Sequence, residues 1–344
     1  MYKNILVNAL VNLGDVVLAT SACDLIKKNF PDTKITMLVK GVVKDAVINN
    51  PAVDDVIAFE YKARKKSFGD MYNIIREIRR RKFDLAISFD RKLRPALITF
   101  AAGIPRRVCP TKIFEQEKSR VTMLYTDVVD IDYDLFDKPQ SENFQEIVRR
   151  FFKIEGRGVP KFPANFSDNV AKLLNQIPND KIKIALCVKG TFPLKTYPKE
   201  YFAEVVKALR EKYNAAFFII GAPNDKTYAD EVIAEIGGEV LNFCGETSLP
   251  DVAEIFRRSD LFITVDTGAM HIAATTGIKT VALFGCSPVV RYSPVNENSV
   301  VLSSHENCCP CHIKVTECPS YPKPNCLYNV KPSEVIAAAV NFLS

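Results

Sequence analysis

A short apolar segment followed by Asp-Thr-Gly brings three chemically useful groups together. Residues 261–265 are typical of a buried strand, and a helical pattern begins a few residues later. In open α/β sheets, ligands bind at the carboxyl ends of the strands. Gly268 could therefore let the backbone approach an anion closely, and the helix N-terminus could offer its unpaired N–H groups, with the Asp266 carboxylate beside them. A simple helix cap would have the same sequence features.

A second carboxylate, Asp15, follows the first apolar segment of the chain. It lies in the sequence Leu-Gly-Asp-Val-Val-Leu-Ala-Thr, where Gly14 is expected to allow a tight turn after a strand over 4–10. In this position Asp15 could act as a general base toward a substrate hydroxyl, and the structural alternative is a helix N-cap. The chain has no Gly-x-Gly-x-x-Gly sequence, so a dinucleotide cofactor is not supported.

Two further loops could bind a nucleotide. After the apolar segment 183–188, the hydroxyl of Thr191 and the ammonium group of Lys195 could hold a diphosphate, because lysine supplies a mobile positive charge. Asp225 follows the segment 216–221 and could accept hydrogen bonds from ribose hydroxyls. A solvated lysine and a proline-containing turn are the corresponding structural alternatives.

The elements that must position these residues alternate between apolar strands and helical patterns, which favours parallel α/β sheets. Glycine and proline interrupt the pattern near 155–180, and a second alternation then begins. We therefore predict two doubly wound, Rossmann-like domains, 1–165 and 166–330, that face each other across a cleft, and a helix in 331–344 that packs back on them. The expected strands are 4–10, 34–39, 56–58, 84–88, 183–188, 216–221, 240–242, 260–265 and 280–284. The expected helices include 19–29, 70–81, 199–212, 249–259 and 332–343.

The composition is that of an ordinary globular protein, with 344 residues, 47% hydrophobic and 25% charged. A net charge of +6 suits an anionic substrate or membrane surface but does not indicate nucleic acid. The chain has no run of about 18 apolar residues that could span a membrane. Polar residues, Asp15 among them, interrupt the N-terminal apolar stretch, which argues against a signal peptide. The protein is therefore predicted to be cytoplasmic.

Several segments, in order along the chain, resemble glycosyltransferase family nine, the ADP-heptose:lipopolysaccharide heptosyltransferases. They are the Leu-Gly-Asp segment at 13–20, Lys-x-Tyr-Pro at 195–198, Gly-Glu-Thr-Ser-Leu at 245–249, and Asp-Thr-Gly-Ala-Met-His at 266–271 with Val-Ala-Leu-Phe-Gly at 281–285. The resemblance implies a GT-B fold and an inverting transfer of heptose from ADP-heptose to the inner core (Kdo/heptose) of lipopolysaccharide. It also implies that catalysis needs no metal or cofactor and takes place at the inner face of the cytoplasmic membrane.

The same resemblance assigns roles to individual residues. Asp15 matches the catalytic aspartate, and Lys195 matches the lysine that binds the donor diphosphate. Asp266 matches an aspartate near the donor sugar. Thr267 and Gly268 match backbone donors to phosphate.

Two residues depart from the family pattern and leave the donor sugar open. Ala269 stands where proline is frequent, and Tyr197 stands where tryptophan is frequent, although His271 closes the segment as expected. One alternative is a GT-B enzyme that uses another nucleotide sugar for a polysaccharide or protein acceptor. A second alternative is a non-catalytic nucleotide- or sugar-binding protein on the same scaffold.

Basic residues in the N-terminal half could recognise the acceptor. Arg91, Lys92 and Arg94 follow the expected strand 84–88, and family members often carry a basic residue at the position of Arg94. A lysine and arginine cluster at 62–66 could also contact acidic sugars, lipid phosphates or an anionic membrane. A solvated charge run would fit the same residues.

Ten cysteines are many for one chain, and half of them lie near its end. Four of these could form a tetrahedral structural zinc or iron site, with free thiols or a disulfide as alternatives: Cys308, Cys311, Cys318 and Cys326. His305 and His312 are substitute ligands, and Cys309 is a spare thiol. The remaining cysteines have apolar neighbours and are predicted to be core residues: Cys23, Cys109, Cys187, Cys244 and Cys286.

Overall fold

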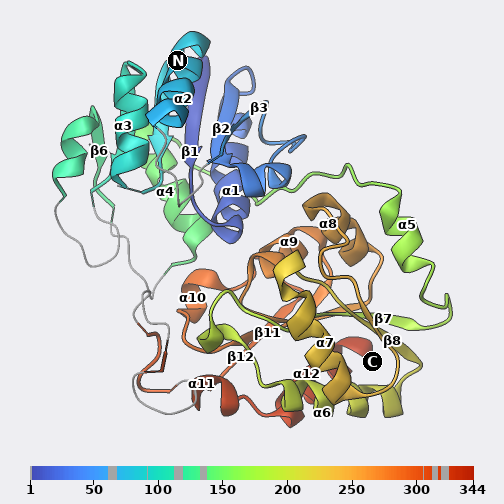
Figure 1. Cartoon of the computed structure of the whole chain (residues 1–344). Helices are drawn as coiled ribbons and strands as arrows, with labels where there is room; N and C mark the ends of the chain where they lie inside the picture. The colour runs from blue at the N-terminus through green and yellow to red at the C-terminus, as the bar shows by residue number, and fades with distance from the viewer. Residues whose placement is uncertain are drawn as a thin grey trace. The chain divides into compact units, whose positions relative to one another are not determined.

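The chain forms two compact units in the computed structural model (Figure 1). We call them the N-terminal unit, Met1–Pro163, and the C-terminal unit, Ala164–Ser344. The structure describes residues 2–60, 68–90, 92–111, 119–131, 138–304, 306–311, 317–318 and 325–344. Each unit contains one six-stranded sheet in which the neighbouring strands run parallel. The prediction of an α/β fold with two Rossmann-like domains is confirmed.

The N-terminal sheet has the strand order β3-β2-β1-β4-β5-β6. Its strands are β1 (Asn4–Ala9), β2 (Lys34–Lys40), β3 (Asp55–Phe59), β4 (Leu85–Ser88), β5 (Arg106–Pro110) and β6 (Asp127–Val129). The helices of this unit are α1 (Leu13–Asn29), α2 (Phe68–Arg81), α3 (Leu93–Ala101) and α4 (Gln140–Phe152), with 3₁₀ turns η1 (Gly41–Ala46) and η2 (Arg120–Leu124). Central strands such as β4 are buried along their whole length, because helices cover both faces of a parallel sheet.

The C-terminal sheet has the order β12-β11-β10-β7-β8-β9. Its strands are β7 (Ile182–Cys187), β8 (Ala215–Ile219), β9 (Val240–Asn242), β10 (Leu261–Val265), β11 (Lys279–Phe284) and β12 (Ser299–Ser303). The α-helices are α5 (Asn169–Leu174), α6 (Lys199–Lys212), α7 (Lys226–Ile236), α8 (Leu249–Arg257), α9 (Gly268–Thr276), α10 (Val289–Tyr292), α11 (Asn325–Tyr328) and α12 (Pro332–Leu343). Two short 3₁₀ turns, η3 (Pro193–Lys195) and η4 (Pro223–Asp225), complete the unit.

Apolar spacing explains how these helices attach to the sheet. In α6, Phe202, Val205, Val206 and Leu209 are buried and lie on one face at helical spacing. They join side chains of β7, β8 and β10 in one continuous core. The last helix, α12, packs against α6 and contacts β10 and β11.

The two sheets share one topology, and that topology decides where a ligand can bind. When the strands are numbered from the first strand of each unit, both sheets have the order 3-2-1-4-5-6. The direction in which successive strands are added to the sheet reverses between the first and fourth strands, although all strands run parallel. The reversal lies between β1 and β4 in the N-terminal unit and between β7 and β10 in the C-terminal unit. Loops at the carboxyl ends of these strands diverge and leave room for a ligand.

The structure also corrects several expected elements. Helix α1 begins at Leu13, six residues earlier than the expected start at 19, so Gly14 lies inside its first turn and does not form the turn before it. Strands β5, β6 and β12 were not expected. Among the described residues, no helix is both long and apolar enough to cross a membrane.

Candidate active site

A polar network of the C-terminal unit lies where β7, β10 and β11 end. The Lys195 ammonium nitrogen is 2.6 Å from the Asp266 carboxylate oxygen Oδ2, although the two residues are 71 positions apart. The Ser287 hydroxyl donates to the same oxygen at 2.5 Å. Asp266 is buried, so its charge is tolerated because a cation and a hydrogen-bond donor both contact it. This network fixes Lys195 at the carboxyl edge of the sheet.

The loop that carries Lys195 is closed tightly on itself. A Cβ atom on Gly190 would lie 2.4 Å from the Cβ of Lys195 and 2.5 Å from its carbonyl oxygen, so a side chain at 190 would displace this loop. At the end of the loop, the buried Tyr197 hydroxyl donates a hydrogen bond of 2.8 Å to the Val330 carbonyl. Burial raises the pKa of Tyr197, which therefore remains a neutral donor. Thr191 lies exposed on the same loop.

Asp225 lies at the next position along this edge, after β8. Its Oδ1 pairs with the Lys189 ammonium group at 3.1 Å, and its Oδ2 accepts the Ala222 backbone N–H at 3.0 Å. The Lys189 ammonium group also donates to the Asn224 carbonyl at 3.3 Å. Both carboxylate oxygens are thus engaged within this network, and Lys189 connects the β7 and β8 loops.

Helix α9 begins at the same edge, directly after β10. Thr267 is its N-cap and Gly268 its first residue, and the first N–H groups of a helix have no partner within the helix. The helix N-terminus therefore presents N–H donors and a partial positive charge to an anion. His271 is buried one turn further on, and burial lowers its pKa to about 4, so its imidazole is neutral near pH 7.

The N-terminal unit brings a different set of charges to its own switch point. Asp15 is in the first turn of α1, where the helix N-terminus favours a carboxylate. The Lys40 ammonium group, at the end of β2, donates to the Asn12 side-chain oxygen at 3.1 Å. Burial lowers the pKa of Lys40, and the positive charge of Lys92 lowers it further, while Asp15 and Asp90 oppose this shift. These electrostatic interactions place Lys40 among the charged residues of the β1–β4 switch point.

The predicted acceptor residues follow β4 at this switch point. The Lys92 ammonium nitrogen pairs with Asp90 Oδ2 at 3.0 Å. Arg94 is half-buried in the first turn of α3. Arg91 lies outside the described residues, as does the basic cluster at 62–66.

Three residues of these networks were not singled out as ligand-binding residues from the sequence. Ser287 follows β11, Lys40 ends β2, and Lys189 follows β7. A serine before a proline or a lysine at the end of a strand has no distinctive pattern. Their common signal is position, because each lies at or just beyond the carboxyl end of a parallel strand.

The cysteines near the end of the chain form a thiol cluster. Cys309 and Cys326 share a side-chain hydrogen bond, which together with burial raises the pKa of Cys309. The Cys311 thiol contacts the Cys308 carbonyl at 3.6 Å. Among the described residues, no group of three or more His, Cys, Asp or Glu side chains is arranged to hold a metal ion. The four-cysteine metal site of Cys308, Cys311, Cys318 and Cys326 therefore stays a prediction without support from the structure, and His305 and His312 lie outside the described residues.

Four of the five cysteines predicted to be core residues are buried, but Cys286 is only half-buried. It follows β11, near the thiol cluster, and its carbonyl accepts the Cys311 backbone N–H at 3.0 Å.

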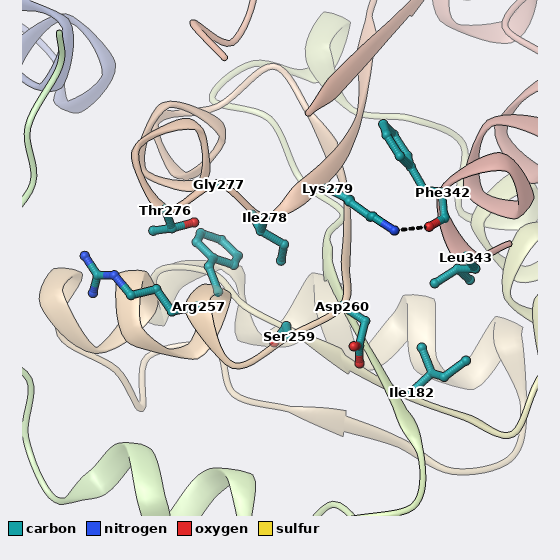
Figure 2. A pocket seen from close by; sticks show the side chains of 11 residues that line it. Ile182, Arg257, Ser259, Asp260, Thr276, Gly277, Ile278, Lys279, Phe342 and Leu343 are labelled. Atoms are coloured by element: carbon teal, nitrogen blue, oxygen red, sulfur yellow. Dashed lines mark hydrogen bonds between the residues drawn. The ribbon is translucent and has the colours of Figure 1, made fainter. Parts of the chain in front are cut away.

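A cavity of about 400 Å³ lies at the opposite edge of the C-terminal sheet (Figure 2). Its lining includes residues just before or at the start of β7, β10 and β11, such as Ile182, Asp260 and Lys279. The charges in it already have structural partners. Lys279 donates to the Phe342 carbonyl, as the dashed line in Figure 2 shows, and Asp260 accepts the Lys183 backbone N–H at 2.7 Å. We therefore assign this cavity no role in ligand binding.

Two Rossmann-like units are typical of proteins with a GT-B fold, and a lysine and a helix N-terminus at a switch point suit the binding of a nucleotide phosphate. The chain belongs to glycosyltransferase family 9 (heptosyltransferase), whose model matches residues 71–321. It is therefore a glycosyltransferase, as predicted from the sequence.

Relatives match nearly the whole chain. Lipooligosaccharide heptosyltransferase 2 of Campylobacter jejuni subsp. jejuni serotype O:2 is 26% identical over an alignment of 341 positions, which covers 96% of this chain and 95% of that protein. The structure of a family 9 glycosyl transferase from Veillonella parvula matches with a TM-score of 0.83 at 21% identity, covering 99% of this chain and 97% of that one. The E. coli ADP-heptose lps heptosyltransferase II matches with a TM-score of 0.79 at 20% identity, covering 99% and 98%. At these identities the solved structures show a common fold.

Proposed function

We propose that this protein transfers heptose from ADP-heptose to the inner core of lipopolysaccharide, with inversion at the sugar. The N-terminal unit binds the acceptor, and the C-terminal unit binds the nucleotide sugar. The observation that carries the proposal is the Lys195–Asp266–Ser287 network beside the N-terminus of α9, in a chain that belongs to the heptosyltransferase family. The names of the relatives, which are heptosyltransferases acting in lipooligosaccharide or lipopolysaccharide synthesis, support the choice of sugar and acceptor.

In this proposal the C-terminal unit stabilises the leaving group. Breaking the bond between sugar and diphosphate develops negative charge on the phosphate oxygens, and fixed positive groups lower the energy of that transition state. Lys195 supplies the full charge, while the backbone N–H groups of Thr267 and Gly268 supply oriented donors. Thr191 lies on the Lys195 loop and contributes a hydroxyl to the diphosphate. Asp225 accepts hydrogen bonds from the ribose.

Two neighbouring groups have supporting roles in donor binding. The carboxylate of Asp266 holds Lys195 in place and orients hydroxyl groups of the sugar, where its negative charge also favours the cationic transition state. His271 is buried in α9 with a neutral imidazole, so it adds no positive charge near pH 7. The leaving group is therefore neutralised mainly by Lys195 and the helix N-terminus.

In the acceptor half, Asp15 is the proposed general base. It takes the proton of the acceptor hydroxyl as that oxygen attacks the anomeric carbon on the face opposite the departing diphosphate, which gives inversion. Lys40, Lys92, Arg91 and Arg94 bind the anionic groups of the inner core. Because Lys40 and Asn12 are hydrogen-bonded, they also help to define the position of the first turn of α1.

We further propose that transfer takes place in the cytoplasm, at the inner face of the membrane, and that it needs no added metal ion or cofactor. The support for metal independence is chemical, because Lys195 and the α9 N–H groups can supply the positive field that a divalent cation would otherwise provide. Addition of a chelator should leave the initial rate of transfer unchanged.

The test of the function is a nucleotide panel followed by a transfer assay. Calorimetric binding of ADP, UDP, GDP and CMP to the whole protein should show selective binding of ADP. Transfer from ADP-heptose to a Kdo-bearing acceptor should then be observed and should require Asp15. Selective binding of UDP or GDP would overturn the ADP-heptose assignment in favour of another nucleotide sugar. Failure to bind any nucleotide would overturn the assignment of the donor site.

A further inference from the structure

Helix α3 of the N-terminal unit exposes an apolar face. Leu93, Leu97 and Phe100 are 55%, 40% and 51% exposed, and their spacing of four and three residues puts them on one side of the helix. The opposite side of α3, including Ile98 and Thr99, is fully buried in the core. The exposed side therefore has no part in the core packing of the unit.

The adjacent turn η2 extends this apolar face. Val121 and Leu124 of η2 pack against the buried cluster of Ala96, Cys109 and Tyr125, and η2 contacts α3 directly. Met123 of η2 is 81% exposed. We call the exposed side chains of Leu93, Leu97, Phe100 and Met123 the α3–η2 patch. Apolar side chains that cluster on a surface, with polar residues around them, commonly mark an interaction site.

Arginines surround the α3–η2 patch. The Arg107 guanidinium carbon lies 5.3 Å from the centre of the Phe100 ring, and its Nε donates to the Leu124 carbonyl at 2.8 Å. Arg79 of α2 donates to the Ala101 carbonyl at the end of α3 at 2.6 Å. Arg120 is exposed on η2, and Arg94 lies in the first turn of α3.

Among the residues that the structure describes, negative charge is sparse around the same patch. Neither α3 nor η2 contains an acidic residue. The nearby Asp90 pairs with Lys92, and Asp127 pairs with Arg106. In the described part of the chain, the patch therefore combines exposed apolar side chains with a net positive rim. This combination is characteristic of surfaces that rest on anionic lipid.

We propose that the α3–η2 patch docks on an anionic lipid bilayer. The apolar side chains enter the boundary between headgroups and acyl chains, and the arginines contact lipid phosphates. Helix α3 starts directly after the loop at the end of β4, which carries the proposed acceptor residues. Docking at α3 therefore brings the acceptor loop to the bilayer in which a lipid-linked acceptor resides. This last step rests on the proposed function, whereas bilayer binding by the patch does not.

The test is flotation of the whole protein with lipid vesicles. The wild-type protein should bind vesicles of phosphatidylcholine that contain about one third phosphatidylglycerol, and it should bind less to phosphatidylcholine alone or at high salt. The double variant Leu97→Gln/Met123→Gln should bind at least about ten-fold more weakly, because two apolar side chains no longer leave water. The control Val159→Gln/Val300→Gln, which replaces exposed apolar residues elsewhere, should bind like the wild type.

Two further measurements separate the outcomes. Melting temperatures should agree among the three proteins, and transfer to a water-soluble acceptor without acyl chains should be unchanged. Absence of wild-type binding, or equal binding by the Leu97→Gln/Met123→Gln variant, would overturn the docking proposal. So would a wild-type dimer that the same variant converts to a monomer, because a second copy would then occupy the patch. If the wild-type protein transfers no sugar to the soluble acceptor, that result would instead count against the proposed function. It would not affect the conclusion from vesicle binding.

Discussion

The two units use one strand order but build their switch points differently. In the C-terminal unit, the key charge is buried and braced: Asp266 contacts Lys195 and Ser287, and Tyr197 ties the lysine loop to Val330. In the N-terminal unit, the charged groups near Asp15 are half-buried or exposed, and Lys40, Lys92, Asp90 and Asp15 influence one another electrostatically. The same topology can therefore support two kinds of site. In one the side chains are held by buried contacts, and in the other they interact mainly as partly exposed charges.

This difference has a consequence for mutations. In the C-terminal unit, a site substitution should alter ligand binding and stability together, because the same contacts serve both. In the N-terminal unit, a site substitution should alter rate or acceptor binding with little change in stability.

The largest effect is expected for Asp15→Asn. Loss of the general base should lower kcat by about 10²–10⁴-fold, while the affinity for ADP and the melting temperature stay close to those of the wild type. Initial rates, calorimetry and thermal unfolding measure the three quantities. An equal fall in ADP affinity would show that Asp15 belongs to donor binding and would remove the contrast between the two units.

The second effect is expected for Lys195→Gln. Removal of the cation should weaken ADP binding by about 10²-fold, in line with the loss of a charge-assisted contact to phosphate. It should also lower the melting temperature by roughly a few degrees, because the buried Asp266 keeps only its neutral donor. A matched exposed lysine, Lys212→Gln, should change neither quantity. Normal ADP binding by Lys195→Gln would contradict the assignment.

The third prediction concerns pH and His271. The folded-state pKa is lowered from 6.5 to about 4 by burial, so between these values the unfolded chain binds a proton that the folded protein does not. Stability should therefore be complete above about pH 6.5 and should fall as the pH drops toward 4, by up to about 3 kcal/mol from this one group. Thermal unfolding of His271→Gln should show a weaker loss over the same window. Parallel curves for the two proteins would argue against a buried neutral imidazole.

The smallest effect is expected for Lys40→Gln. The KM for an anionic acceptor should rise about ten-fold through loss of one charge contact, whereas ADP affinity should not change. The melting temperature should change little, since Lys40 is only half-buried. Steady-state kinetics with varied acceptor and fixed donor make the measurement. A large loss of stability would show that the contacts of the N-terminal site contribute to folding as much as those of the C-terminal site do.

Much of the fold could be predicted because the central strands are buried on both faces and therefore form apolar runs. The runs over β1, β2, β7, β10 and β11 are of this kind. The strands that were not expected lack this signal. Strand β5 begins with two arginines, β6 has only three residues, and β12 lies at the edge of its sheet.

The candidate site was less accessible to sequence reasoning. Asp15, Lys195 and Asp266 each come after a buried strand, and a buried strand forms an apolar run in the sequence. Their positions at strand ends could therefore be predicted. The pairing of Lys195 with Asp266 depends on two strands that are neighbours in the sheet but distant in the sequence. Ser287 and Lys40 are recognisable only after the strand order places each of them at the carboxyl edge of its own sheet. Long-range contacts of this kind leave no local pattern.

The bond between Lys195 and Asp266 also bears on turnover. The Asp266 carboxylate competes with the donor diphosphate for the Lys195 ammonium group. Because both residues belong to the same folded unit, the carboxylate is present at a high effective concentration and pairs with Lys195 again whenever the phosphate dissociates. This competition limits the affinity of the protein for both the donor and the nucleotide product. Asp266, which holds Lys195 in place before the donor binds, would thereby also shorten the residence time of the nucleotide product.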